Sequence, residues 1–237
     1  QHSLRRLVIF FATPELLERT TAFLGPVWCH GFGSTEQGAV TTRLLAAEVA
    51  GNPERLESVG RAAAPFFEVA IFGDDGERKP PGELGEIAVR SAMSTSAYWG
   101  MPERTAQAFL DGDWFRPDDI GYLDEDGFLY YVDRAVDSIA TPNGTVYPHT
   151  VEAAVLRHRS VANCGVVGDD EGNIVAAVAL KPGVAETTAL LDEIRAAATP
   201  GLQEHEVPHI LVVDELPTVL GGAKVQRGVL RERVVGA

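Results

Sequence analysis

Apolar and polar residues follow two different patterns along the chain, and the first of them predicts a strand followed by a helix. Residues 4–11 form a short apolar run typical of a strand, and the next segment, TPELLERTTAFLG, has apolar residues at helical spacing. Thr13 is a suitable N-cap for this helix, and Pro14 suits the first helical position because its missing amide causes no loss there.

The middle of the chain, from about Val59 to Asp133, shows the two-residue period of β-strands. FEVAIF leads into an Asp-Gly turn, GELGEIAVRS supplies a second alternating strand, and GFLYYVDR continues the pattern. Turn residues separate these strands at short intervals, as in sheets made of consecutive antiparallel strands. We therefore predict an antiparallel β meander or small barrel in this region.

After residue 137 strands and helices alternate. GTVYPHTVEAAVLRH predicts a strand and then a helix opened by Pro148, and CGVVGDDEGNIVAAVALKPG predicts two strands joined by a turn. TTALLDEIRAAAT and VQRGVLRERV predict helices on either side of the strand HILVVDEL. Such a mixture indicates a separate small domain. We therefore expect an α+β protein with two domains, residues 1–136 and 137–237.

Composition fits an ordinary globular protein and limits its partners. The 237 residues are 45% hydrophobic and 23% charged, which allows a sizeable core. The net charge of −14 would repel nucleic acid and anionic membranes, so neither is an expected partner. No apolar run approaches the roughly 18 residues of a membrane span. Cys29 and Cys164 show neither a pairing pattern nor metal-site spacing, which favours buried thiols and a cytoplasmic location.

The segment GFGSTEQG, residues 31–38, is the first candidate for chemistry. Its backbone amides and the hydroxyls of Ser34 or Thr35 could contact phosphate oxygens, and Glu36 could hold Mg²⁺. The alternative is a glycine-rich turn with a capping threonine, which the residue types alone favour.

Two further segments carry similar alternatives. In WFRPDDIG, Asp118 and Asp119 share a turn where a carboxylate could accept both hydroxyls of a ribose, although aspartates in turns commonly bond their own backbone. Lys224 follows two nearby glycines in a loop that could bring its ammonium to a developing phosphate charge. The alternative there is a solvated lysine before a helix.

In their order along the chain, these segments resemble a known family. GFGSTEQG is followed by GELGEIAVR, by YWGMPERTAQAFLDGDWFRPDDIGYLDEDGFLYYVDRAVDSI, by GTVYPHTVE and by LPTVLGGAKVQRGVLRER. Their order and spacing resemble the second half of the AMP-forming acyl-CoA synthetases and adenylation domains, from about residue 4 to residue 233. The resemblance implies the end of a large AMP-binding domain, with a βα unit and the β meander, followed by a small mobile C-terminal domain.

The resemblance also implies a reaction, its cofactors and its partners. In this adenylate-forming family a carboxylate attacks the α-phosphate of ATP to give an acyl adenylate, with Mg²⁺ at the phosphates. The small domain then rotates, and a thiol, usually that of coenzyme A, displaces AMP. The expected partners are a small-molecule carboxylate, fatty or aromatic, and coenzyme A or the pantetheine of a carrier protein.

By the same resemblance, the loop of residues 31–38 supplies the nucleotide and metal contacts. Phe32 corresponds to the aromatic residue that packs on adenine, and Gly33 is its neighbour in the nucleotide site. Thr35 corresponds to the hydroxyl that contacts phosphate, and Glu36 to the carboxylate that holds magnesium.

The remaining implied residues lie later in the sequence. Asp119 and Arg134 correspond to the two residues that bind the ribose, and Asp137 to the hinge between the domains. Lys224 corresponds to the mobile lysine that bridges the substrate carboxylate and the phosphate. With Thr35 and Glu36, it completes the expected catalytic set.

The sequence departs from the family pattern at several places. The family's Gly-, Ser- and Thr-rich phosphate loop does not occur in it, so we expect a fragment that needs a complementary N-terminal chain for activity. Pro117 and Asp118 stand where Thr and Gly are usual, and Pro142 and Asn143 stand where a glycine pair normally lines the path of the thiol. Gly-Gly-Ala-Lys replaces Ser-Gly-Lys at Lys224.

Three hypotheses about function follow. The first is an acyl- or aryl-CoA ligase, which the retained polar site residues favour. The second is an amino-acid-activating adenylation domain that loads a carrier protein. The third is a non-catalytic interaction module that kept the fold, which the altered loops at Pro117 and Pro142 favour.

Overall fold

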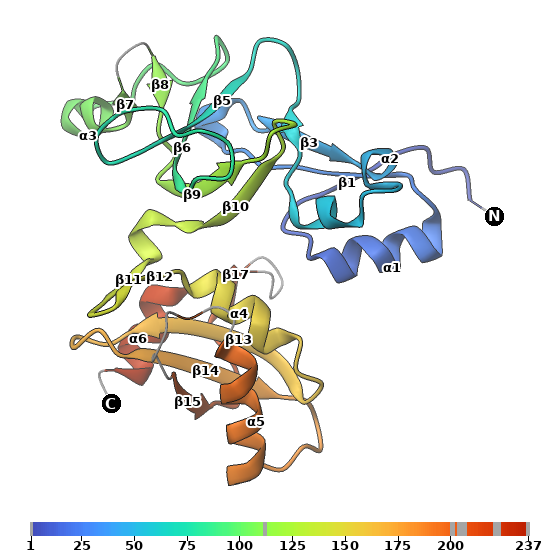
Figure 1. The fold of residues 1–237 in the computed structure, drawn as a ribbon, viewed down its shortest axis with the longest axis vertical. Helices are drawn as coiled ribbons and strands as arrows, with labels where there is room; N and C mark the ends of the chain where they lie inside the picture. Colours follow the sequence, from blue (N-terminus) through green and yellow to red (C-terminus); the bar gives the residue numbers. More distant parts are fainter. Residues whose placement is uncertain (1, 111–112, 200–201, 203–207, 220–223, 236–237) are drawn as a thin grey trace. The chain divides into compact units, whose positions relative to one another are not determined.

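The computed structural model describes residues 2–110, 113–199, 202, 208–219 and 224–235. The chain forms two compact units, Gln1–Val132 and Asp133–Ala237 (Figure 1). The sequence placed the domain boundary after residue 136, so the boundary between the compact units falls slightly earlier. Each unit has its own hydrophobic core.

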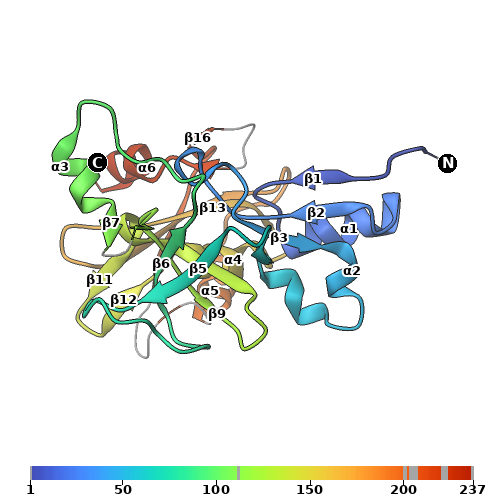
Figure 2. The same ribbon diagram turned by 90° about the horizontal axis from the view of Figure 1, so that it is seen from above.

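A four-stranded sheet with one packed helix forms the first part of unit 1 (Figure 2). In chain order its elements are β1 (Leu7–Ile9), α1 (Pro14–Leu24), β2 (Trp28–His30), β3 (Thr42–Leu45) and β4 (Arg61–Ala62). β1 and β2 are parallel, and α1 is the crossover helix between them. The hydroxyl of Thr13 accepts a hydrogen bond from the amide of Leu16 at 3.3 Å, so the predicted N-cap is confirmed.

The second sheet of unit 1 has six strands. They are β5 (Glu68–Phe72), β6 (Gly85–Arg90), β7 (Phe109–Leu110), β8 (Trp114–Phe115), β9 (Asp119–Leu123) and β10 (Leu129–Arg134). The pairs β5–β6, β6–β9, β6–β8 and β7–β8 are antiparallel, as the sequence predicted. The order differs from a simple meander because β6 pairs with β8 and β9 rather than with β7, its successor in the chain.

Short helices connect the strands of unit 1. They are η1 (Thr35–Gln37), α2 (Ala46–Val49), η2 (Pro53–Glu57) and α3 (Pro102–Gln107). The apolar periodicity of the sequence did not predict them, because helices of one or two turns are too short to show a helical repeat.

Unit 2 is built around a three-stranded sheet with helices on both faces (Figure 1). Its elements are η3 (Ala135–Asp137), β11 (Ile139–Thr141), β12 (Gly144–Val146), α4 (Pro148–Leu156), β13 (Val161–Gly168), β14 (Ile174–Leu180), α5 (Thr188–Ala198), β15 (His209–Val212), β16 (Thr218–Val219), β17 (Lys224–Val225) and α6 (Arg227–Val234). β13 and β14 are antiparallel, whereas β14 and β15 are parallel.

The central strand β14 shows why the sequence of unit 2 has a continuous apolar run. Ile174, Ala176 and Val178 pack in the cluster formed with α4 and α5, whereas Val175 and Ala177 pack in the cluster formed with α6. A strand buried on both faces needs apolar residues at every position, so it loses the alternation of a half-exposed strand.

A substitution at Leu17 tests the core that packs against the first sheet. Its side chain is fully buried with Trp28, whereas Leu16, its neighbour on α1, is 43% exposed. Leu17→Ala should lower the free energy of unfolding by about 2–5 kcal/mol, because it removes buried methyl groups and leaves a cavity. Leu16→Ala is the matched control and should cost less than about 1 kcal/mol.

The measurement is urea unfolding followed by tryptophan fluorescence. The three tryptophans, Trp28, Trp99 and Trp114, all belong to unit 1, so the signal reports on that unit alone. Equal losses for the two variants would contradict the packing described.

Candidate functional site

The loop between β2 and β3 contains several of the expected site residues and is closed by its own backbone. The amides of Thr41 and Thr42 both donate to the carbonyl oxygen of Phe32, at 2.9 and 3.1 Å. The carbonyl oxygen of Ser34 accepts from the amide of Ala39 at 2.8 Å. These bonds fold residues 32–42 back on themselves and hold η1 at the tip.

Gly33 lies where this loop approaches itself most closely. A Cβ atom at this position would lie 2.5 Å from the carbonyl oxygen of Ala39, and one at Gly31 would lie 2.3 Å from that of Thr42. Both contacts are with backbone atoms, which cannot swing aside as the end of a flexible side chain can. Packing therefore explains Gly31 and Gly33, the first two glycines of GFGSTEQG.

Phe32 links the loop to the second sheet of unit 1. Its ring packs against that of Tyr131 on β10, with centroids 6.0 Å apart. Leu123 of β9 belongs to the same apolar cluster. The loop thus lies against the sheet that contains Asp119, another expected site residue, at the first position of β9.

Glu36 lies in η1 and is held through both its backbone and its side chain. Its carbonyl oxygen accepts from the amide of Thr95 at 2.7 Å, and its Oε1 accepts from the hydroxyl of Tyr98 at 3.3 Å. The amide of Glu36 itself lowers the pKa of its carboxyl most. Burial opposes this effect, and Ser34, Tyr98 and the charge of Arg104 lower the pKa further. Glu36 is therefore ionised at neutral pH.

One ionised carboxylate is suited to Mg²⁺ in the presence of phosphate. Among the described residues, no group of three or more His, Cys, Asp or Glu side chains could hold a metal ion. Mg²⁺ commonly binds proteins through one or two carboxylates and takes its other ligands from water and substrate phosphates. The surroundings of Glu36 therefore fit a magnesium ion that arrives with a nucleotide.

The turn before Asp119 contains a residue with a left-handed backbone conformation. Asp118 has a φ of 62°, in the left-handed region that glycine adopts most readily and that aspartate tolerates better than most residues. Arg116 forms an ion pair with Glu86 of β6, which ties the turn to the sheet. Asp118 thus takes the backbone conformation that suits the glycine usual in related sequences.

The other expected residues belong to unit 2. Arg134 is the last residue of β10, Asp137 is the last residue of η3, and Lys224 is the first residue of β17. The backbone of Lys224 is paired with Val219 of β16. The side chain of Lys224 and the loop of residues 220–223 lie outside the described residues.

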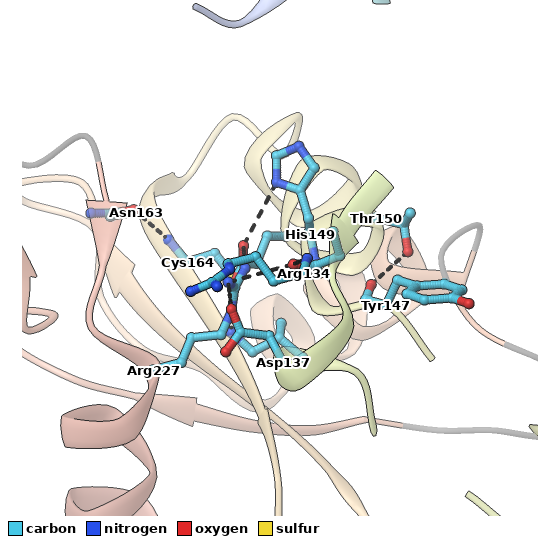
Figure 3. Close-up of polar contacts among 11 residues, drawn as sticks. Arg134, Asp137, Tyr147, His149, Thr150, Asn163, Cys164 and Arg227 are labelled. Carbon is cyan, nitrogen blue, oxygen red and sulfur yellow. Dashed lines mark hydrogen bonds and ion pairs between the residues drawn. The ribbon is translucent and has the colours of Figure 1, made fainter. Parts of the chain in front are cut away.

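Asp137 is part of an ionic cluster centred on Arg227, a residue that the sequence did not single out. The Nη1 atom of Arg227 lies 3.1 Å from Asp137 Oδ2 and 3.6 Å from Asp133 Oδ1 (Figure 3). Its Nη2 atom lies 2.7 Å from Glu152 Oε2 on α4. One guanidinium thus contacts three carboxylates from different parts of unit 2.

Backbone amides donate to further oxygens of Asp133 and Glu152. Asp133 Oδ2 accepts from the amide of His149 at 2.6 Å, and Glu152 Oε1 accepts from that of Val166 at 2.9 Å. Burial works against the charge of Arg227, but the carboxylates outweigh it and raise its pKa. Burial has the largest influence on Glu152 and raises its pKa, against the opposing charge of Arg227.

The sequence offered little sign of the cluster because its members are far apart in the chain. Arg227 is 75 residues from Glu152 and 90 from Asp137. A single arginine near the start of a helix is ordinary on a protein surface. The signal that could have found it is the pair of acidic residues at buried strand and helix positions, Asp133 and Glu152, which need a cationic partner.

Two family models match the chain. The model described as AMP-binding enzyme matches residues 6–99, and the model described as AMP-binding enzyme C-terminal domain matches residues 150–220. The chain therefore belongs to the AMP-binding, adenylate-forming enzyme family.

Curated relatives include ligases that form CoA thioesters. The chain is 44% identical over 169 residues to 2-succinylbenzoate–CoA ligase of Geobacillus kaustophilus, which corresponds to 68% of this chain and 34% of that protein. It is 34% identical over 223 residues to feruloyl-CoA synthase of an Amycolatopsis species, covering 92% of this chain and 42% of that one.

Solved structures agree with this assignment. An amide bond synthetase from Marinactinospora thermotolerans superimposes with a TM-score of 0.84 at 33% identity, covering 97% of this chain and 47% of that one. The o-succinylbenzoate CoA synthetase of Bacillus subtilis, in complex with its acyl-adenylate intermediate, gives a TM-score of 0.83 at 28% identity. The match covers 98% of this chain and 46% of that one. The chain spans less than half the length of each of these proteins.

Within the described ranges, no helix combines the length and the apolar character needed to cross a bilayer.

Gly33→Ala is expected to destabilise the chain by about 1–3 kcal/mol, because the new methyl group overlaps the backbone at Ala39 and forces it to move. Gly228→Ala is the control, since a Cβ atom there meets nothing within 4 Å. Urea unfolding followed by circular dichroism measures both. A neutral Gly33→Ala would show that the loop has more room than described.

Arg227→Gln is expected to lower the free energy of unfolding of unit 2 by about 3–5 kcal/mol, because it leaves buried carboxylates without their cation. Arg231→Gln, one turn later on α6, is the matched control. Its partner Asp170 is exposed, so its loss should be about 1 kcal/mol or less. Circular dichroism follows the unfolding transition. An equal loss of unfolding free energy in the two variants would show that the ion pairs of Arg227 contribute no more than an exposed ion pair.

Proposed function

We propose that this chain carries the adenosine and magnesium contacts and the mobile C-terminal unit of an AMP-forming acyl- or aryl-CoA ligase. The observation that carries the proposal is the loop of residues 31–38, which lies in the region matched by the AMP-binding model. The loop packs on the sheet of Asp119 through Phe32 and carries Glu36, whose carboxyl pKa is lowered. The reaction would convert a carboxylate and ATP to an acyl adenylate and pass the acyl group to a thiol.

The residues of unit 1 would bind the nucleotide. Phe32 would pack on adenine, and Asp119 would accept the ribose hydroxyls, since a carboxylate has lone pairs for both. Thr35 and the backbone beside Gly33 would contact phosphate, and Glu36 would hold Mg²⁺. The bound ion would neutralise phosphate charge during attack by the substrate carboxylate.

The residues of unit 2 would act when that unit moves. Arg134 would reach the ribose, and Asp137 would serve as the hinge about which unit 2 rotates. Lys224 would bring a positive charge to the oxygens where negative charge develops during adenylation. Rotation would then remove this lysine and admit the thiol, as domain motions commonly separate two half-reactions.

The acceptor and the substrate belong to this proposal as well. Relatives named for CoA ligation favour coenzyme A over carrier-protein pantetheine, and their named acids favour a fatty or aromatic carboxylate. The proposal includes a complementary N-terminal segment with phosphate-binding groups, because the relatives are at least twice as long. The two free, buried cysteines, Cys29 and Cys164, support a reducing cytoplasm as its location.

A different acceptor is the second candidate. Pro142 and Asn143 form the tip of the β11–β12 hairpin, where related sequences place a glycine pair along the path of the thiol. The similarity to an amide bond synthetase makes an amine the alternative nucleophile. Release of AMP from a synthetic acyl adenylate, with coenzyme A or with an amine, separates the two.

Calorimetric titration with AMP, and with ATP and Mg²⁺, tests the proposed function. We expect saturable binding that Asp119→Asn weakens about 10- to 100-fold, because hydrogen bonds to a charged group contribute about 1.5–3 kcal/mol. Asp118→Gly is the matched control: it removes the adjacent carboxylate and relaxes the left-handed residue, so binding should stay within about twofold. Absence of binding at millimolar nucleotide would overturn the proposal.

A further inference from the structure

The segment between β6 and α3, residues 91–101, packs directly on the turn that carries Glu36. Thr95 donates its amide to the Glu36 carbonyl oxygen at 2.7 Å, and the Tyr98 hydroxyl donates to Glu36 Oε1 at 3.3 Å. On the far side of η1, a Cβ atom on Gly38 would lie 3.1 Å from Cβ of Met93. This segment therefore touches the Glu36 turn through backbone, side chain and close packing.

Tyr98 is itself fixed by α3. Its amide donates to the hydroxyl of Thr105 at 2.9 Å. The guanidinium carbon of Arg104 lies 4.4 Å from the centroid of the Tyr98 ring, within the range of a cation–π contact. The phenol is thus held at its backbone by one residue of α3 and at its ring by another, which fixes where its hydroxyl points.

A carboxylate that serves as one of few protein ligands to a metal needs such a neighbour. A free glutamate side chain rotates among several conformers, whereas a hydrogen bond to one oxygen fixes the group and leaves lone pairs on the other. Partners of this kind orient metal ligands, and their loss commonly reduces metal affinity 10- to 100-fold.

We propose that Tyr98, held by Arg104, is the positioning residue that orients Glu36 toward the magnesium ion of ATP. The inference rests on the proposed function and adds to it residues outside the loop itself. Neither residue needs to touch the nucleotide: Tyr98 acts through Glu36, and Arg104 acts through Tyr98 and through its positive charge near the carboxylate.

The test compares Tyr98→Phe, which removes only the hydroxyl, with Tyr122→Phe, the same change at a ring stacked on Tyr130 in β10. Calorimetry measures the affinity for AMP without metal, and the Mg²⁺ concentration needed for half-maximal ATP binding. We expect Tyr98→Phe to raise that Mg²⁺ concentration about tenfold. It should leave the AMP affinity within about twofold, and Tyr122→Phe should leave both values unchanged.

Arg104 supplies a graded second test. Arg104→Lys keeps the charge and should retain most of the magnesium response, whereas Arg104→Met should approach Tyr98→Phe. Hydrogen exchange of peptides covering residues 31–40 should rise in Tyr98→Phe and Arg104→Met, because the turn loses its support.

The outcomes separate this inference from the proposed function. A chain that binds neither AMP nor ATP with Mg²⁺ would overturn the proposed function and this inference with it. Normal nucleotide binding with an unchanged magnesium response in Tyr98→Phe would overturn the inference alone. An equal loss of AMP and ATP affinity would also overturn it, since that result indicates a general structural role.

Discussion

The partly buried guanidinium of Arg227 is the interaction on which unit 2 depends. A charge removed from water is stable only if its surroundings replace the lost hydration. Asp133, Asp137 and Glu152 do so, and backbone amides from α4 and β13 donate to further oxygens of Asp133 and Glu152. The cluster therefore couples the first residues of unit 2, its first long helix and its last helix. Because Asp137 belongs to it, the proposed hinge is linked to the helix that follows Lys224.

A steric constraint has the same importance in unit 1. The loop after β2 folds back so closely that Gly31 and Gly33 face backbone atoms, and no larger residue fits at either position without moving them. This closeness places Phe32 on the second sheet and presents Glu36 at the tip. The segment of residues 91–101 then covers the loop and bonds to Glu36. The candidate magnesium ligand is thus positioned by parts of the chain about 60 residues apart, through contacts of ordinary strength.

Local signals in the sequence predicted most long elements but few of their partners. Thr13 and Pro148 mark the starts of α1 and α4, because capping and proline geometry act within one turn. The pairing of β6 with β8 and β9 had no such signal, since short strands with similar patterns can pair in several orders. The sequence motifs identified the loop of Glu36 and the turn of Asp119 as candidate parts of the site. They did not identify Tyr98 or Arg227, because the sequence around these residues carries no recognisable signal.

The sequence by itself determined the α+β class, the main helices and strands, and the family, because hydrophobic period, caps and ordered motifs are properties of neighbouring residues. Tertiary structure decided which charges are buried together, which strand lies at the centre of each sheet, and which side chain supports Glu36. Asp118 shows the division well. Its residue type marked a departure from the family pattern, whereas only the structure shows that its backbone is left-handed, with a φ of 62°. Contacts between distant residues depend on how the whole unit packs, and no local pattern records them.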